Sequence, residues 1–344
     1  MNIKQVAGKL LFLFSVWAIP ACAQVADVTP LFQEEKPLSI RLAFSFKEIK
    51  KNTNDSIYFP TLLYYKNEKN GWDSLSIRIR GRGNFRRKNC YFTPIRIKIK
   101  KGDATHTPFE GNKNLKLVLP CLPAKNFNDL ILKEYICYQL YEPATPYTFN
   151  TRLLDITLSD RSGKQIKTHQ VRGFFIEDDN LIAKRFNGKV VDSLNLHPKS
   201  LHDTSSVRHD FFEYMIANTD WSTTFHHNAK LILVAPKKYI PVAYDFDMSG
   251  FVNAPYAETN STLEITSVRQ RVFRGFCRNE AVTQYVRTEY IQAKPVLLKV
   301  LDRYETDFTA KEFAGMKKYM LEFFDILESD KSFRENILQK CRTK

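Results

Sequence analysis

Apolar and polar residues alternate strictly through most of the first half of the chain. A repeat of two residues is typical of a half-buried β-strand. The alternation predicts strands at 38–46, 57–65, 75–80, 95–99 and 115–119. Residues 153–158 and 166–177 predict a hairpin around Asp160-Arg161-Ser162-Gly163. Pro60 favours a place near a sheet edge for the second strand, because proline cannot donate a ladder hydrogen bond.

Helical spacing dominates the second half. A first helix is predicted at 127–141, and residues 178–218 are expected to be mostly helical with loops. Residues 231–234 and 239–244 flank Pro236-Lys237-Lys238, which indicates one more hairpin. Beyond Glu280 the pattern is helical. We therefore expect an α+β fold with a β-rich N-terminal lobe at 24–177 and a mainly helical C-terminal lobe at 178–344.

The first 23 residues have the pattern of a secretory signal peptide. Lys4 and Lys9 precede an apolar run at 10–19, and Ala21-Cys22-Ala23 supplies a small-x-small cleavage site. The run is too short to cross a bilayer, for which about 20 residues are needed. The sequence thus predicts an exported protein without a transmembrane segment after cleavage, in the periplasm, in the cell envelope or secreted. A lipoprotein anchored through Cys22 is the alternative.

Composition narrows the classes of function. The 344 residues are 43% hydrophobic and 13% aromatic, which excludes general disorder. The formal charge is +15, and cleavage of the signal peptide with its two lysines lowers it to +13. This surplus favours an acidic partner. The sequence contains no recognisable nucleic-acid-binding module, so we do not expect nucleic acid to bind. The five cysteines outside the signal peptide leave at least one free thiol, and we expect one disulfide or none.

Two basic segments are candidates for phosphate binding. Arg80-Gly81-Arg82-Gly83-Asn84 lies between two predicted strands, where glycines let backbone amides approach an anion closely. A hairpin tip with solvated charges explains the same residues equally well. The strand that follows carries Arg96, Lys98 and Lys100 on its polar face. One of them could reach a bound anion, although an ordinary solvent-facing strand shows the same alternation.

A third cluster combines carboxylates with an amide. Asp220 follows an apolar helix, Asn228 comes eight residues later, and a strand delivers Asp245-Phe246-Asp247. On an extended segment the two outer carboxylates share a face about 7 Å apart. Carboxylate and amide oxygens suit Mg²⁺ or Mn²⁺ better than zinc. Asp220 could then accept a proton from an attacking hydroxyl. Each residue also has a structural explanation, as a helix-end turn, a loop cap or an N-cap.

The neighbouring pair His226 and His227 raises the question of a zinc site. The two side chains project to different sides if the segment is extended. We expect one of them to orient a site residue, or to lie on the surface, rather than to bind a metal.

The order of these motifs resembles the spore coat protein H (CotH) kinase family over roughly 74–256. The resemblance rests on Arg80-Gly81-Arg82-Gly83-Asn84, on Gly173-Phe174-Phe175-Ile176-Glu177, and most of all on the segment 211–256 with its Asp220 and Asp245-Phe246-Asp247. It implies a two-lobed protein-kinase-like fold and phosphorylation of an extracytoplasmic protein with ATP and Mg²⁺ or Mn²⁺.

The resemblance also implies roles for single residues. Asp220 would be the catalytic base, and the metal ligands would be Asn228, Asp245 and, as a second ligand or loop support, Asp247. Gly81, Arg82 and Gly83 would cover the phosphates. Lys98 would pair with a phosphate and with Glu134 on the first helix, and Glu177 would lie near the adenine.

Three functions follow from these observations. The first is an exported, metal-dependent transfer of a phosphoryl group from ATP to a protein hydroxyl. The second is a catalytically inactive kinase-like protein of the cell envelope that binds an acidic partner, an alternative favoured by the scarcity of ATP outside the cytoplasm. The third is a metal-dependent phosphoester hydrolase that uses the same carboxylates.

Overall fold

The computed structural model describes residues 28–83, 85–192 and 196–343. The predicted signal peptide at 1–23, Cys22 within it, and Asn84 of the glycine-rich segment lie outside the described residues.

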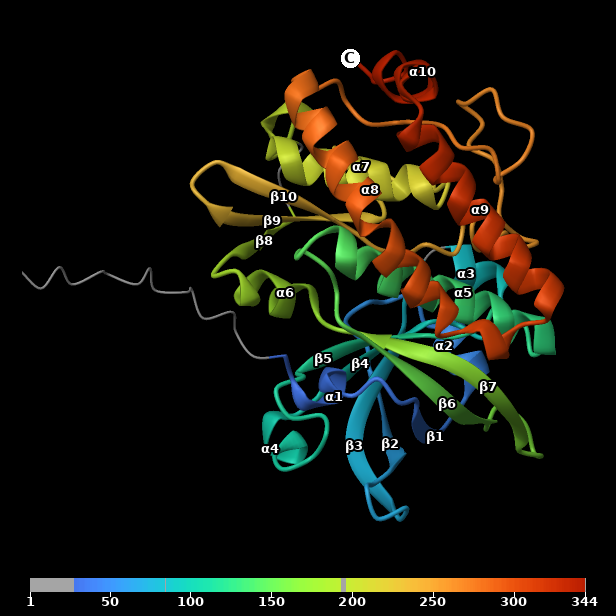
Figure 1. Ribbon diagram of the computed structural model, residues 1–344. Helices are drawn as coiled ribbons and strands as arrows, with labels where there is room; N and C mark the ends of the chain where they lie inside the picture. The colour runs from blue at the N-terminus through green and yellow to red at the C-terminus, as the bar shows by residue number, and fades with distance from the viewer. Residues whose placement is uncertain (1–27, 84, 193–195, 344) are drawn as a thin grey trace, which may run out of the picture.

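Seven strands in the first half form a closed barrel, drawn in the lower part of Figure 1. They are β1 Leu38–Phe44, β2 Phe59–Lys66, β3 Trp72–Gly81, β4 Ile95–Ile99, β5 Asn114–Val118, β6 Thr151–Asp160 and β7 Lys167–Ile176. Their order around the barrel is β1-β2-β3-β4-β5-β7-β6. The inward positions of the alternating pattern, such as Ile77, Ile97 and Leu117, fill the barrel with apolar side chains. The predicted strands are thereby confirmed.

The expectation of a two-lobed protein-kinase-like fold is wrong. The barrel is closed because β1 pairs in parallel with β6, from Leu38↔Leu154 to Phe44↔Asp160, while its other neighbour β2 is antiparallel. The N-terminal lobe of a typical protein kinase does not contain a closed barrel of mixed parallel and antiparallel strands. Alternation indicates that a segment is a strand and which face is buried, but it does not identify the partner strand. The coarser prediction, a mixed α+β protein, holds.

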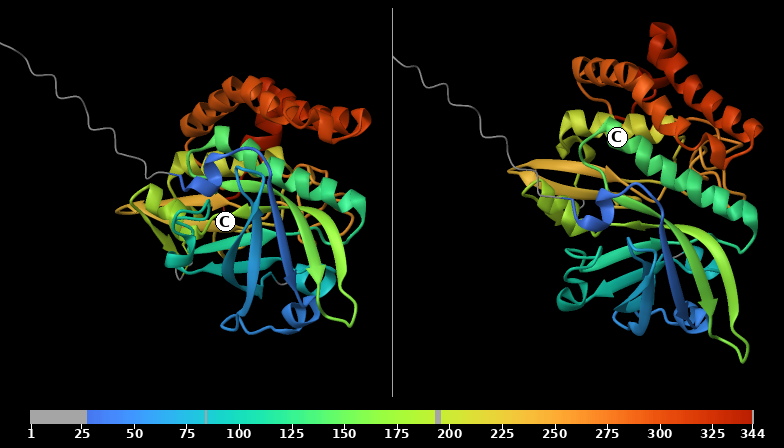
Figure 2. Two further views of the ribbon diagram at one scale, coloured as in Figure 1. Left: turned by 90° about the horizontal axis from the view of Figure 1, so that it is seen from below. Right: turned by 60° about the horizontal axis from the view of Figure 1, so that its bottom comes forward.

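Helices cover one side of the barrel and are the main regular structure of the second half (Figure 1, Figure 2). They are α1 Pro30–Gln33, α2 Phe46–Lys51, α3 Phe85–Asn89, α4 Lys101–Ala104, α5 Lys125–Tyr141, α6 Asp179–Arg185, α7 Asp203–Met215, α8 Glu280–Asp302, α9 Ala310–Glu328 and α10 Asp330–Phe333. A separate antiparallel sheet has the order β10-β9-β8, with β8 Lys189–Val191, β9 Ala229–Ala235 and β10 Lys238–Ala243. Among the described residues, no helix is both long and apolar enough to cross a membrane.

The long helix α5 lies between the barrel and the other helices (Figure 2). It contacts β7 on one side and α8 on the other. Its buried residues, among them Ile136 and Leu140, belong to the core that α7, α8, α9 and β10 share. Phe174 of β7 joins this core, whereas its neighbour Phe175 points into the barrel. The α5 and β7 segments thus connect the two hydrophobic cores.

Two disulfides stabilise the described chain, so the expectation of one bridge or none is wrong. Cys90 pairs with Cys121 and Cys277 with Cys341, at Cα–Cα distances of 4.6 and 4.8 Å. The expectation rested on the size of the chain, which does not need disulfides for a stable core, and chain size does not determine how many cysteines lie close enough to pair. Cys137 is free and buried, which confirms the expected free thiol.

Candidate active site

Asp220 and Asn228 close a rigid loop between α7 and β9. The Asn228 side-chain amide donates to the backbone oxygen of Asp220 at 2.7 Å and to its carboxylate Oδ2 at 3.0 Å. Within the loop, Ser222 and His227 exchange two backbone hydrogen bonds of 2.8 and 3.0 Å. The loop therefore holds the Asp220 carboxylate at a fixed place next to Asn228.

His227 is the second partner of Asp220. Its Nε2 lies 2.9 Å from Asp220 Oδ1, and both side chains are about half exposed. The hydrogen bond to Asp220 raises the pKa of His227, although partial burial opposes this. The prediction that one histidine of the pair orients a site residue agrees with this contact.

A buried polar network supports the Asp220 loop from below. The Asn218 side-chain oxygen accepts a hydrogen bond from the Asp220 backbone N–H at 3.0 Å. The Asn218 backbone N–H donates to the Glu213 backbone oxygen at 2.8 Å. Arg274 donates to the backbone oxygens of Thr219 and Trp221 on either side of Asp220. Burial raises the pKa of the Glu213 carboxyl well above its ordinary value, although Asn218 opposes this shift.

Asp245 lies in the irregular segment that follows β10 and not on an extended strand. β10 ends at Ala243, and Asp245 has a φ of 66°, in the left-handed region. Its backbone N–H donates to the Tyr138 hydroxyl of α5 at 2.9 Å. Phe246 is fully buried behind it. The predicted arrangement of Asp245 and Asp247 on one face of a strand is therefore wrong, because the left-handed backbone of Asp245 interrupts the extended conformation.

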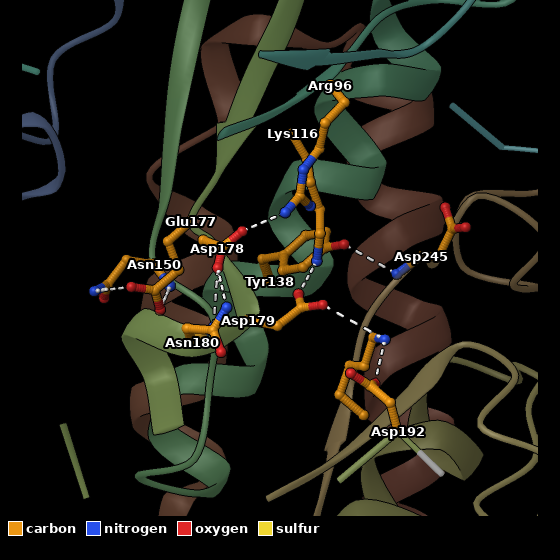
Figure 3. A network of polar contacts seen from close by, with 11 residues as sticks. Arg96, Lys116, Tyr138, Asn150, Glu177, Asp178, Asp179, Asn180, Asp192 and Asp245 are labelled. Atoms are coloured by element: carbon orange, nitrogen blue, oxygen red, sulfur yellow. Dashed lines mark hydrogen bonds and ion pairs between the residues drawn. The ribbon is translucent and has the colours of Figure 1, made fainter. Parts of the chain in front are cut away.

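Figure 3 shows the Asp245 carboxylate pointing away from Tyr138. Within the described part of the chain, it makes no side-chain hydrogen bond or ion pair that fixes it. Its charge raises the pKa values of Asp247, Glu134 and His227, so it lies within electrostatic reach of all three. Asp245 is therefore the member of the cluster that is freest to bind a cation.

Asp247 points into the protein and meets Arg86 of α3. Arg86 Nε lies 3.7 Å from Asp247 Oδ2, and Arg86 Nη1 lies 3.5 Å from Glu134 Oε2 of α5. The guanidinium also donates to the backbone oxygen of Leu119. All three charged side chains are buried. One cation thus lies between two carboxyl groups.

Two carboxyls and one guanidinium cannot all be ionised at low cost in a buried place. Burial raises the pKa of Asp247 to about 6, with Arg86 opposing and the charge of Asp245 adding to the effect. Burial raises the pKa of Glu134 well above its ordinary value, again against Arg86. Near neutral pH, above a pKa of about 6, Asp247 is mainly ionised and can pair with Arg86, whereas burial favours the neutral form of Glu134.

Barrel cations face this region from β4 and β5 (Figure 3). Arg96 and Lys116 lie directly opposite each other on the two strands. Arg96 pairs with Asp178 and Lys116 with Asp179, at the start of α6. These carboxylates offset the repulsion between neighbouring cations. Lys230 of β9 is 3.5 Å from Asp179 and extends the network toward the second sheet.

Lys116 has the most unusual surroundings of these cations. Its ammonium lies 4.6 Å from the centre of the Phe149 ring and 5.0 Å from that of Tyr244. Burial lowers the pKa of Lys116, although Asp179 opposes this shift. Tyr244 directly precedes Asp245, so Lys116 approaches the carboxylate cluster from the barrel side.

The glycine-rich segment follows β3 at the same end of the barrel. Gly83 has a φ of 75°, and a Cβ there would meet open space, whereas one on Gly81 would meet the Ile49 backbone oxygen at 3.0 Å. The charge of Arg82 affects the pKa values of Lys116 and Glu134. Arg82 and Gly83 thus border the carboxylate cluster, whereas Gly81 is packed within the barrel.

Two predicted nucleotide contacts lie elsewhere. The Lys98 ammonium stacks on the Tyr58 ring at 4.3 Å from its centre, on the outer face of the barrel. It does not reach Glu134, whose partner is Arg86. Both carboxylate oxygens of Glu177 lie 2.6 Å from Arg185 Nη1, and Asn150 donates to Glu177 as well. Glu177 is therefore held in an ion pair where β7 leads to α6.

The oxygen donors fit a magnesium ion in part. Asp245 offers an open carboxylate, and Asn228, whose NH₂ group is bound to Asp220, has its amide oxygen left as a donor. Asp247 Oδ2 is buried without a hydrogen-bond donor, but Arg86 lies next to it. Across residues 28–83, 85–192 and 196–343, no three His, Cys, Asp or Glu side chains are grouped to hold a metal. Mg²⁺ commonly uses one or two protein carboxylates together with substrate phosphates and water.

Sequence reasoning missed Arg86, Lys116 and the acidic pair Asp178-Asp179. Lys116 carries a weak signal, because it is the cation between Leu115 and Leu117 on a strand that is otherwise apolar. Arg86 has none, because Arg87 and Lys88 follow it directly and nothing in the run distinguishes the buried member.

Comparison with known proteins adds no relative to this picture: no protein-family model matches the chain, and no curated protein matches it either.

Proposed function

We propose that this chain is an exported, metal-dependent phosphotransferase that transfers a phosphoryl group from ATP to a protein hydroxyl. The proposal takes its reaction from the resemblance to the CotH kinase family and does not depend on a kinase-like fold. The observation that carries it is the junction of Asp220, Asn228 and Asp245, which faces basic side chains of the barrel.

Each group has the chemistry that its role requires. Asp220 is half exposed and fixed by Asn228 and His227, so it can accept the proton of an acceptor hydroxyl. Asp245 and Asn228 would hold the divalent ion, which supplies charge neutralisation at the phosphates. Arg82 and Lys116 would contact phosphate oxygens from the barrel side. Export accords with the two disulfides, which persist in oxidising compartments.

One observation favours a second function, a catalytically inactive binding protein. The cations nearest the carboxylate cluster already have acidic partners, since Lys116 pairs with Asp179 and Arg96 with Asp178. A phosphate group would have to compete with these carboxylates. A chain that uses the ion pairs only for stability would show the same contacts.

Thermal unfolding with and without nucleotide separates the two functions. We expect ATP with Mg²⁺ or Mn²⁺ to raise the melting temperature of the chain, because a ligand of the folded state stabilises it. Asp245→Asn should abolish this shift. Asparagine is the appropriate replacement, because it tolerates the left-handed backbone of position 245, whereas alanine would add strain. Asp155→Asn, at an exposed position on β6, is the matched control and should keep the shift.

Transfer itself is measured by mass spectrometry of the chain and of added acceptor proteins after incubation with ATP and Mn²⁺. Asp220→Asn should retain the thermal shift and lose the incorporated phosphate. Binding of nucleotide without any incorporation would favour the binding protein. Absence of both, with a folded chain, refutes the proposal. Release of phosphate from a phosphoester without nucleotide would instead indicate the hydrolase.

A further inference from the structure

A groove of about 710 Å³ opens on the barrel, apart from the carboxylate cluster. Its lining comes from the end of β1, the start of β2, the middle of β3 and the end of β4. The volume lies within the range of clefts that bind ligands, roughly 300–1,000 Å³. Lys98, which the sequence suggested for phosphate, is one of its walls.

The groove forms where two strands of the barrel separate. β1 and β2 are paired only from Ile40↔Tyr65 to Leu42↔Leu63. Beyond this point Phe44 continues along β6, and the first half of β2 pairs only with β3. Pro60, which has no N–H, lies on this separated stretch of β2. The Thr61 hydroxyl donates to the Ala43 backbone oxygen and the Arg161 N–H donates to that of Phe44, both at 2.9 Å. A ligand in the groove would therefore be held by side chains and not by strand addition.

Side chains of two kinds line this groove. Phe44, Phe59 and Leu62 give it an apolar floor, and Leu62 is 44% exposed although it is a large hydrophobic residue. Four cations stand around the floor, namely Arg78, Lys98, Lys100 and Arg161. Among the described residues, none of the four is within ion-pair distance of a carboxylate, in contrast to Arg96 and Lys116.

We propose that this groove binds an extended peptide segment in which acidic and apolar side chains alternate. Successive side chains of an extended peptide point to opposite sides, so one set can pack on the apolar floor while the other reaches the cations. Arg78 and Lys98 are direct neighbours across β3 and β4, which places two unpaired positive charges side by side.

The lining disfavours a dense polyanion such as a sulfated glycan. Glu48 and Asp103 also line the groove, and they would repel a ligand that is negative along its whole length. An apolar floor likewise contributes nothing to such a ligand. The proposal is independent of phosphoryl transfer, because binding needs neither nucleotide nor metal and is tested without them.

The test is fluorescence anisotropy with the full mature chain and a labelled peptide of four Glu-Val repeats. We expect saturable binding that weakens with added salt, and no binding of a peptide of four Lys-Val repeats. The double variant Arg78→Glu, Lys98→Glu should lower the affinity at least about tenfold. The matched control reverses two exposed lysines at the β6–β7 tip, Lys164→Glu and Lys167→Glu, and should change it less than about twofold.

A second variant separates the groove from general charge. Leu62→Asp changes an exposed apolar floor residue and should also weaken binding strongly, with the fold verified by circular dichroism. Failure of the Glu-Val peptide to bind overturns the proposal. So does an equal loss in the control, or a heparin chain that binds as tightly as the peptide and is insensitive to Leu62→Asp.

Discussion

Arg86 is the position where one substitution should destabilise the molecule most clearly. Its guanidinium is buried between Asp247 and Glu134 and donates to the Leu119 backbone oxygen. Arg86→Met keeps much of the side-chain volume and removes the charge. Asp247 would then be an ionised carboxylate without a cation in a buried place.

The expected cost follows from this geometry. Removal of one partner from a buried ion pair typically costs about 3–5 kcal/mol, because the remaining charge must be desolvated without compensation. The Arg86 side chain is only 9% exposed and Asp247 7%, so solvent offers little relief. We therefore expect Arg86→Met to lower the free energy of unfolding at pH 7.5 by about 3–5 kcal/mol, as measured by urea denaturation.

Glu134→Gln is the informative companion, because glutamine matches the neutral acid in shape. If burial keeps Glu134 protonated, this variant should change the free energy of unfolding by less than about 1 kcal/mol. A loss as large as that of Arg86→Met would refute this reasoning, since it would mean that Glu134 is ionised and is the main partner of Arg86. If Arg86→Met is as stable as wild type, the inference that Asp247 depends on the Arg86 charge is also refuted.

Three further outcomes can be measured. The pKa of Asp247 is about 6 in the folded chain against 3.8 ordinarily, so the folded state binds the proton more tightly. The free energy of unfolding should fall by about 3 kcal/mol as the pH rises from about 4 to about 7, and Asp247→Asn should remove this slope in urea titrations. Asp220→Asn should lower the pKa of His227 toward 6.5, as followed by NMR, and an unchanged value would contradict their pairing. Replacement of both Cys277 and Cys341 by serine opens a loop of about 64 residues and should cost about 4 kcal/mol in urea unfolding, with a cost below about 1 kcal/mol speaking against the bridge.

Local patterns in the sequence predicted the elements well and their assembly poorly. Alternation such as Ile95, Ile97 and Ile99 identifies a strand because one face is buried, whatever its neighbours are. The closure of the barrel depends on the pairing of Leu38 with Leu154, which no local signal encodes. The alternation therefore predicted a β-rich N-terminal lobe but not its closure into a barrel.

The same limit applies to the site. Asp220 and Asn228 could be predicted as neighbours, because a short loop joins them. The resemblance implied Lys98 as the phosphate-pairing residue, whereas Arg96 lies two residues, or about 7 Å, along the same polar face of β4. That distance moves a side chain from the carboxylate cluster to the outer groove. Alternation identifies the face of a strand and not the ligand that its end approaches.

The charges of the site come from different parts of the chain, and this has a consequence for ligand binding. Arg96 and Lys116 belong to the barrel, whereas their partners Asp178 and Asp179 belong to the segment that follows it. The barrel and the helices are joined by apolar packing between β7 and α5, and this packing does not involve the ion pairs. A phosphate that binds Lys116 must therefore compete with Asp179, while α5 and β7 keep the two parts of the molecule together. If the phosphotransferase proposal holds, nucleotide affinity is set by this competition, so neutralising Asp179 should strengthen binding even as it removes a stabilising ion pair.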